Sequence, residues 1–181
     1  VTDKEMPSEA YELCIKKSGV VIKASDDKGR FYALQTLKQL AEAEVMYCGV
    51  IKDEPRFPWR GFMLDESRHF HGKEKVKMLL DMMARYKLNR FHWHLSDDQG
   101  WRIEIKAFPN LTTMGGIGCN TDANAPAKFY TQDEVREILA YAAERHIEVI
   151  PEIDMPGHTT AFTKVFPQLN GKNRTVNPGK E

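Results

Sequence analysis

The stretch RFHWHLSDDQGWR, residues 90–102, runs from a short apolar segment into a cluster of polar side chains. Successive side chains of a strand point to opposite faces, so His92 and His94 share one face while the alternating apolar side chains share the other. This alternation indicates a strand over Arg90–Leu95 that packs one face against a hydrophobic core. The strand is expected to end where the acidic residues begin.

Two further strand-like segments lie on either side, and helical patterns separate all three. Residues 59–65 form a short apolar run that predicts a buried strand, and residues 147–154 are rich in branched apolar residues. Residues 73–87 repeat apolar positions at helical spacing, and Thr131 with Glu134 forms a capping box that opens a second helix. Strand, helix, strand, helix, strand is the pattern of a parallel α/β sheet.

Strands of this kind begin either a doubly wound sheet or a (β/α)8 barrel. No glycine-rich turn follows the first strand, which disfavours a dinucleotide-binding fold. The chain has 181 residues, whereas a complete (β/α)8 barrel needs about 250. The sequence therefore predicts an α/β fold that contains a partial (β/α)8 TIM barrel, with about the first three strands.

A different pattern precedes these strands. Residues 11–24 alternate as in a β-hairpin, and Ser25 or Asp26 can cap the helix that follows. The hairpin and the helix are expected to end a small α/β domain whose beginning is absent.

The stretch PRFPW, residues 55–59, marks a domain boundary near residue 53. Residues 1–52 are therefore assigned to the end of the small α/β domain, and residues 53–181 to the N-terminal part of the barrel. Residues 96–130 are too long for an ordinary connection, and loops of that length are usually functional or disordered.

Charge and cysteine content exclude several classes of protein. Basic and acidic residues number 26 each, so no net charge favours binding to nucleic acid or to a membrane surface. No apolar run approaches the roughly 20 residues of a membrane span. Cys14, Cys48 and Cys119 show no C-x-x-C spacing, so neither a zinc site nor a disulfide framework is expected. The oligomeric state stays open, a homo-oligomer included.

Polar side chains follow each predicted strand at its end. The carboxyl ends of parallel strands meet at one edge, where α/β enzymes build their sites. After the first strand, Arg68 either ties down its loop through Asp65 or presents its planar fork to sugar hydroxyls or to a carboxylate. After the second strand come Asp97 and Asp98.

The third strand ends in Glu152 and Asp154, and a Pro-Gly turn leads on to His158. Residues two apart on a strand share a face, so both carboxylates are expected to point toward the site. The turn lets His158 look back over the strand ends. A site rich in carboxylates, in which no Ser, Cys or Lys nucleophile stands out, suits the cleavage of carbohydrates.

A metal site is the main alternative. An H-x-H pair at the end of a barrel strand begins the binuclear site of some metal-dependent hydrolases, and His92, His94 and His158 keep that reading open. A single H-x-H pair is a weak signal, because most buried histidines hydrogen-bond to their neighbours instead.

Four segments resemble glycoside hydrolase family 20, the β-N-acetylhexosaminidases, in order and in spacing. They cover most of the chain after residue 53, and the preceding residues resemble the end of the small domain that precedes the barrel in that family. The segments are PRFPWRGFMLDESRHF (55–70), YKLNRFHWHLSDDQGWRIEI (86–105), FYTQDEVREILAYAAERHIEVIPEIDMPGH (129–158) and VNPGKE (176–181).

The resemblance implies roles for particular positions. Arg68 matches the arginine that holds the 3- and 4-hydroxyls of the terminal sugar. Asp97 and His158 match two members of an Asp–His–Glu chain that supports the catalytic acid. Four more residues are expected to support these groups from behind: Asp154, His94, Asp98 and Glu152.

The reaction of the family is the exo-hydrolysis of terminal non-reducing N-acetylglucosamine or N-acetylgalactosamine, with retention and with help from the substrate. The 2-acetamido oxygen attacks the anomeric carbon, an aspartate steers the acetamido group, and a glutamate protonates the leaving oxygen. That aspartate–glutamate pair lies in an H-x-G-G-D-E motif, which residues 1–181 do not contain. The resemblance thus implies a glycosidase with a carbohydrate substrate and no cofactor, and residues 1–181 alone are expected to be inactive.

Two alternatives of other classes remain beside this interpretation. One is the metal-dependent barrel hydrolase, and the other is a sugar-binding module that kept the barrel and lost the chemistry. By resemblance, a periplasmic, secreted or lysosomal location is expected.

Overall fold

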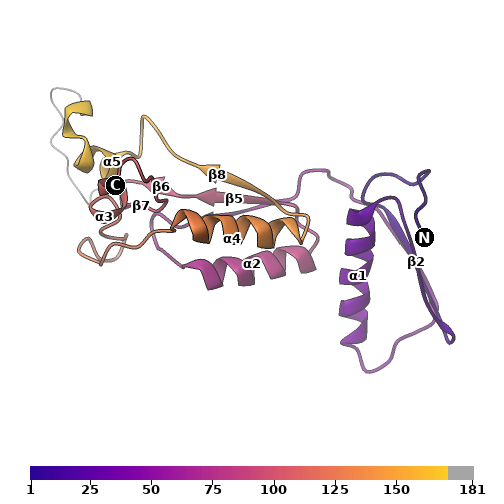
Figure 1. The fold of residues 1–181 in the computed structure, drawn as a ribbon. Coiled ribbons are helices and arrows are strands. Elements are labelled where there is room, and N and C mark those ends of the chain that lie inside the picture. The colour runs from indigo at the N-terminus through magenta and orange to yellow at the C-terminus, as the bar shows by residue number, and fades with distance from the viewer. Residues whose placement is uncertain (171–181) are drawn as a thin grey trace.

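The computed structural model describes residues 1–170. These residues form two three-stranded sheets and one small two-stranded sheet, and helices lie along one face of each larger sheet (Figure 1). The segment VNPGKE at 176–181, part of the family resemblance, lies outside the described residues. No described helix is long and apolar enough to cross a membrane.

The first sheet confirms the predicted hairpin and adds a strand to it. Its order is β2-β1-β3 with antiparallel pairing, and its strands are β1 (Tyr11–Lys16), β2 (Gly19–Ala24) and β3 (Gly49–Asp53). Helix α1 (Asp27–Ala41) packs on this sheet, and its N-cap is Asp26, whose carboxylate accepts the Gly29 N–H at 2.7 Å. The third strand was not predicted, because a short strand that is exposed at alternate positions has little hydrophobic signal.

The second sheet confirms the predicted parallel pattern. Its order is β4-β5-β8, and its strands are β4 (Gly61–Asp65), β5 (Arg90–His94) and β8 (Glu148–Glu152). Helices α2 (Lys73–Arg85) and α4 (Gln132–Ala143) lie side by side on one face (Figure 1). The buried core between helices and sheet includes Val76, Leu80, Met83, Phe91, Trp93, Leu95 and Ile138.

The prediction that the first strand of this sheet is buried is wrong. Phe62 and Met63 of β4 are each 45% exposed, and Trp59, predicted to begin the strand, lies before it and is 63% exposed. Two positions explain this exposure. β4 is an edge strand, and among the described residues no element pairs with its outer side. Met63 in addition lies on the sheet face opposite the helices.

The capping box at the start of α4 is present as predicted. The Thr131 hydroxyl accepts the Glu134 N–H at 3.2 Å, and the Glu134 carboxylate accepts the Thr131 N–H at 2.9 Å. Because loss of such a cap costs about 1 kcal/mol, Thr131→Ala is expected to lower the free energy of unfolding by that amount in urea denaturation. The exposed turn residue Ser18 provides a matched control, since Ser18→Ala removes a hydroxyl without a cap. Equal effects of the two substitutions would contradict the assignment.

The long segment after β5 is ordered and carries structure of its own. It contains the hairpin strands β6 (Ser96–Asp97) and β7 (Gly100–Trp101) and the short helix α3 (Asn110–Thr113). After β8 follow helix α5 (Thr160–Val165) and the 3-10 helix η1 (Pro167–Leu169). A small core of Trp101, Leu111 and Ala161 joins these segments above the strand ends.

Candidate active site

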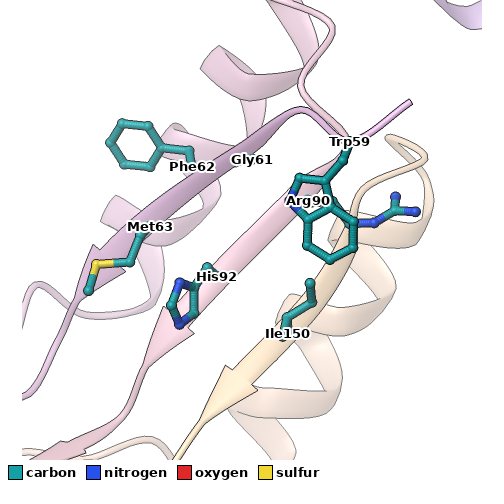
Figure 2. Close-up of a pocket in the computed structure, with 7 residues that line it drawn as sticks. All are labelled: Trp59, Gly61, Phe62, Met63, Arg90, His92 and Ile150. Carbon is teal, nitrogen blue, oxygen red and sulfur yellow. The ribbon is translucent and has the colours of Figure 1, made fainter. Parts of the chain in front are cut away.

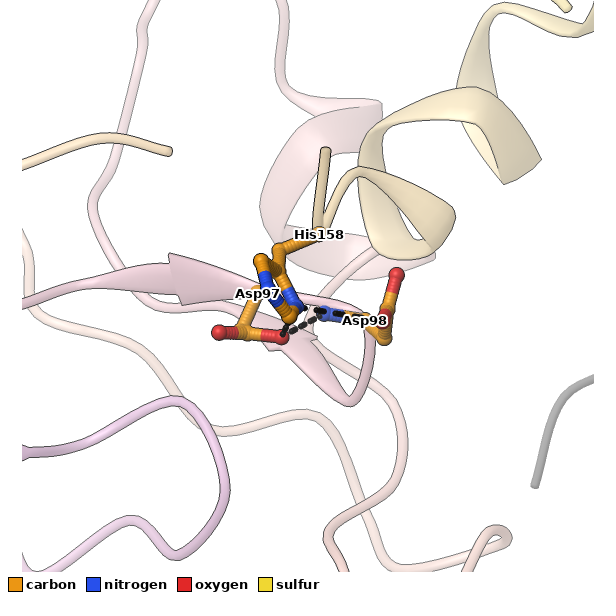
Figure 3. Close-up of side chains that lie close together, drawn as sticks. All are labelled: Asp97, Asp98 and His158. Atoms are coloured by element: carbon orange, nitrogen blue, oxygen red, sulfur yellow. Dashed lines mark hydrogen bonds and ion pairs between the residues drawn. The ribbon is translucent and has the colours of Figure 1, made fainter. Parts of the chain in front are cut away.

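The carboxyl ends of β4, β5 and β8 bring the three main predicted site residues together. A nitrogen of the Arg68 guanidinium, Nη2, lies 2.7 Å from Asp97 Oδ2, and His158 Nδ1 lies 3.2 Å from Asp97 Oδ1. Figure 3 shows His158 beside Asp97 and Asp98, which lie on a β-hairpin. The loops after three strands thus meet at one carboxylate.

Asp97 is the centre of this arrangement. Its side chain is 1% exposed, and both oxygens are engaged. Oδ2 contacts Arg68 Nη2 and, at 2.8 Å, His94 Nε2, while Oδ1 accepts the Asp98 N–H at 2.7 Å and faces His158. A buried carboxylate is tolerated only when it is paired and hydrogen-bonded in this way.

Arg68 contacts both its own loop and a site carboxylate. Nη1 donates to Asp65 at 2.8 Å, and the other Asp65 oxygen accepts the Ser67 and Arg68 N–H groups at 3.0 Å, so the loop is tied down. At the same time Nη2 reaches Asp97. The Arg68 side chain is still 34% exposed.

His158 is held by backbone geometry as well as by charge. It adopts a left-handed conformation with φ 51°, which is uncommon outside glycine. Nδ1 faces both aspartates, at 3.2 Å from Asp97 and 3.5 Å from Asp98, so Asp97 is the closer partner. The side chain is 47% exposed, and the opposite ring nitrogen, Nε2, is turned away from the aspartates.

Asp98 links the site to α5. Its Oδ1 accepts the Thr160 N–H at 3.0 Å and the Thr160 hydroxyl at 2.6 Å. Partial burial raises the pKa of Asp98, but the hydrogen bonds from Thr160 and the nearby His158 outweigh burial and hold that pKa below its usual value. Asp98 therefore stays ionised and fixes the segment that carries His158.

Glu152 and Asp154 do not share a strand face as predicted, because β8 ends at Glu152. The Glu152 carboxylate contacts His92 Nε2 and lies 2.9 Å from His94 Nδ1. Asp154 lies beyond the strand and is tied to the site through its backbone N–H, which donates to Ser96 Oγ at 3.0 Å.

The structure does not assemble the metal site that His92, His94 and His158 were considered for. Both His92 and His94 turn a ring nitrogen to Glu152. Within the described residues, the group with ligand atoms mutually within 4.8 Å is Asp97, Asp98 and His158. Because both Asp97 oxygens already have partners, this group is accounted for by contacts within the protein.

Arg102 organises the site and was not recognised from the sequence. It is 1% exposed, and its guanidinium donates only to backbone carbonyls, at 2.6 to 3.2 Å. Burial lowers the pKa of Arg102. The accepting carbonyls belong to three separate stretches of the chain: Glu66 and Ser67, Gly116 and Gly118, and Lys128.

Glu66 is the second residue without a predicted role. It is fully buried, accepts the His71 N–H at 2.6 Å and accepts the Tyr130 hydroxyl proton at 2.8 Å. Burial raises the pKa of Glu66, and these hydrogen bonds oppose the rise. The α2 N-cap, Gly72, has no side chain, and the Glu66 carboxylate accepts a backbone hydrogen bond from Gly72 at that helix terminus, next to Glu74 in the first turn. The only feature of the sequence that could have indicated this role is an acidic residue beside the Arg68 loop.

The open face of the second sheet bears a hollow of about 380 Å³ (Figure 2). Met63, His92 and Ile150 occupy one row across the three strands, and Trp59 and Arg90 line the end that is farther from the site. His92 also contacts Glu152, so the hollow adjoins the charged groups behind Asp97.

Two family models match the chain. The model described as "Glycosyl hydrolase family 20, catalytic domain" matches residues 57–180, and the model described as "Glycosyl hydrolase family 20, domain 2" matches residues 1–54.

Individual relatives agree with these matches. A protein of Porphyromonas gingivalis named "Beta-hexosaminidase" is 49% identical over 175 residues, which cover 91% of this chain and 22% of the relative. The "N,N'-diacetylchitobiase" of Vibrio harveyi is 44% identical, and the match covers 96% of this chain and 22% of the relative. The solved structure of Streptomyces plicatus N-acetyl-beta-hexosaminidase has a TM-score of 0.87 at 42% identity, with 100% of this chain and 38% of that chain covered. The chain thus spans 22% to 38% of the length of these proteins.

Proposed function

The chain belongs to glycosyl hydrolase family 20, and from that premise we propose that it is part of a β-N-acetylhexosaminidase acting on terminal N-acetylglucosamine or N-acetylgalactosamine. The observation that carries the proposal is the convergence of Arg68 and His158 on the buried Asp97 at the strand ends. The names of the relatives, a beta-hexosaminidase and a diacetylchitobiase, support the same activity.

In this proposal, residues 53–181 begin a (β/α)8 barrel and residues 1–52 end the domain before it. The parallel order β4-β5-β8, with helices on one face only, supports a barrel arc whose open face is the barrel interior. The limits of the two family matches, at residues 54 and 57, support a boundary near residue 53.

Arg68 binds the substrate. Its guanidinium donates to the vicinal 3- and 4-hydroxyls of the terminal sugar, two neighbouring acceptors that N–H groups of one fork can reach together. Asp65 and Asp97 hold the other N–H groups of the guanidinium, so the fork is oriented before the sugar arrives.

Asp97 and His158 position the acid. The Asp97 carboxylate keeps a proton on His158 Nδ1 and so fixes the tautomer, while Nε2 is directed to a glutamate contributed by a later part of the protein. That glutamate protonates the leaving oxygen as the 2-acetamido oxygen forms its bond to the anomeric carbon, and it then activates water. Residues 1–181 therefore hold the recognition and support half of the site.

The test compares two proteins from the same gene: residues 1–181 alone and a chain extended to the length of the relatives. The extended protein is expected to release 4-nitrophenol from its β-N-acetylglucosaminide, whereas residues 1–181 release none, because general acid catalysis contributes about 10²–10⁴-fold and the acid is missing. Hydrolysis by residues 1–181, or inactivity of the folded extended protein, would contradict the proposal.

A second substrate provides the control for mechanism. The matched 4-nitrophenyl β-glucoside lacks the 2-acetamido group, so a substrate-assisted enzyme cannot form its cyclic intermediate from it. The extended protein is expected to leave the glucoside intact. Equal rates on both substrates would favour a two-carboxylate mechanism instead.

A further inference from the structure

Acidic and basic side chains alternate in a chain of contacts that ends at Asp97. The proposed binding of the sugar by Arg68 does not explain why these side chains are there. His92 Nε2 contacts the Glu152 carboxylate, which lies 2.9 Å from His94 Nδ1, and His94 Nε2 lies 2.8 Å from Asp97 Oδ2. His92 and His94 lie on β5, Glu152 ends β8 and Asp97 lies on β6, so these contacts connect the ends of two neighbouring strands to the hairpin that follows β5.

His94 is enclosed at the centre of this chain of contacts. Its side chain is 3% exposed, and it lies between two carboxylates, Glu152 on one edge and Asp97 on the other. A ring with one carboxylate at each nitrogen is most stable with a proton on both, because each proton then faces a negative charge.

Two cationic groups consequently share one oxygen of Asp97. His94 Nε2 and Arg68 Nη2 both lie within 2.8 Å of Oδ2. With Oδ2 held from that side, the carboxylate cannot rotate freely, and Oδ1 is left facing His158. The orientation of Asp97 thus depends on a histidine that is held in turn by Glu152.

We infer that Glu152 and His94 are positioning residues that act through Asp97: Glu152 holds the His94 ring, and His94 fixes the Asp97 carboxylate so that its other oxygen, Oδ1, orients His158. This inference rests on the proposed function, in which His158 positions the catalytic acid.

The direction of the pKa shift of His94 supports these positioning roles. Burial lowers the pKa of His94, but its contacts as a donor to the carboxylates of Glu152 and Asp97 and the negative charges of Glu152 and Asp65 outweigh burial and raise that pKa above its usual value. The pKa of Glu152 is lowered, since the charges and hydrogen bonds of His94 and His92 outweigh its partial burial.

The groups that face His94 come from every neighbouring element. Asp65 ends β4, Arg68 follows it with Nη1 3.3 Å from His94 Nε2, Asp97 lies on β6, and Glu152 ends β8. Three carboxylates against one guanidinium favour the protonated ring. Its contribution is therefore present at low pH and is lost as pH rises through the raised pKa of His94.

The experiment uses the full-length protein and the substitution Glu152→Gln, which keeps size and hydrogen-bonding capacity and removes the charge. We expect kcat to fall about 10- to 100-fold, by analogy with the loss of partners that orient metal-binding side chains, while KM changes less than about threefold. The alkaline limb of the kcat profile should move to lower pH, because His94 loses its proton earlier. Glu148→Gln is the matched control: Glu148 lies on the same strand and face as Glu152 but is exposed and pairs with Arg90.

A second readout does not depend on activity. Imidazole ¹⁵N shifts of the histidine-labelled protein, assigned with a His94→Gln variant, report whether both ring nitrogens of His94 carry protons. We expect wild-type His94 to stay doubly protonated to higher pH than in Glu152→Gln, and Glu152→Asp to restore most of the difference. If Glu152→Gln does not fold, Glu152→Asp carries the comparison, with a smaller shift in the same direction.

The outcomes separate the two proposals. An active wild-type protein whose Glu152→Gln variant matches Glu148→Gln in kcat and pH profile would overturn the positioning role and leave the hydrolase assignment intact. An inactive wild-type protein would contradict the hydrolase assignment. In that case an unchanged His94 titration in Glu152→Gln would also overturn the inference, and a shifted titration would support it.

Discussion

Replacing Arg68 by methionine in the full-length protein is expected to lower kcat/KM by about 10²–10⁴-fold. Two hydrogen bonds from a charged donor to the sugar hydroxyls are worth about 1.5–3 kcal/mol each, and each 1.36 kcal/mol corresponds to a factor of about ten. The substitution also leaves the buried Asp97 with His94 as its remaining cationic partner at Oδ2.

Steady-state kinetics on the 4-nitrophenyl substrate measures this effect, and inhibition by free N-acetylglucosamine measures the loss of sugar binding. Arg68→Lys keeps the charge without the fork, so an intermediate loss is expected. The control is Arg136→Met, which removes an exposed arginine of α4 that pairs with Asp133. A lower melting temperature with unchanged sugar affinity would show that Arg68 only ties down its loop through Asp65.

Replacing Arg102 by methionine is expected to reduce the free energy of unfolding by about 3 kcal/mol or more. Its guanidinium satisfies five backbone carbonyls, and each buried acceptor left without a donor costs about 1–3 kcal/mol. Relief from burying the charge offsets part of this loss. Domains have only about 5–15 kcal/mol of stability, so this loss is a large share of the free energy that keeps the protein folded. The Arg68 loop is expected to lose its structure first, because Ser67 carries one of the carbonyls.

Urea denaturation and thermal melting measure the loss in the same protein. Arg30→Met is the control, since Arg30 is an exposed arginine of α1 that pairs with Asp27. Gly100→Ala is expected to displace the same guanidinium without removing it, because a Cβ at Gly100 would lie 2.2 Å from Arg102 Cζ. A loss below about 1 kcal/mol for Arg102→Met would mean that water replaces the guanidinium at these carbonyls.

Local patterns predicted most of the second sheet and its helices. The alternation of apolar residues predicted β5, and the T-x-x-E capping box predicted the start of α4. The polar residues were predicted to gather at the end of each strand. Helix α2 ends two residues earlier than predicted, since Lys87 adopts a positive φ of 59° that a helix cannot continue.

Other features depend on neighbours that the local pattern does not reveal. The apolar residues of β4 predicted burial, yet Phe62 and Met63 are exposed because the strand lies at an edge and Met63 faces the open side of the sheet. Arg102 resembles a surface arginine in sequence, and only the closing of three distant stretches around it makes it a buried donor.

For the site, the sequence by itself determined which chemical groups stand at the three strand ends, because the period of a strand and the parallel order of α/β units follow from local residues. Arg68, Asp97 and His158 were identified in this way as part of a larger polar set, and the family resemblance singled them out. Only the tertiary structure decided that Asp97 is the point where they meet, and that Glu152 and His94 stand behind it. The reason is physical: a hydrogen bond forms over about 3 Å, and contacts of that length between residues some 30 to 60 positions apart are set by how the chain folds back on itself.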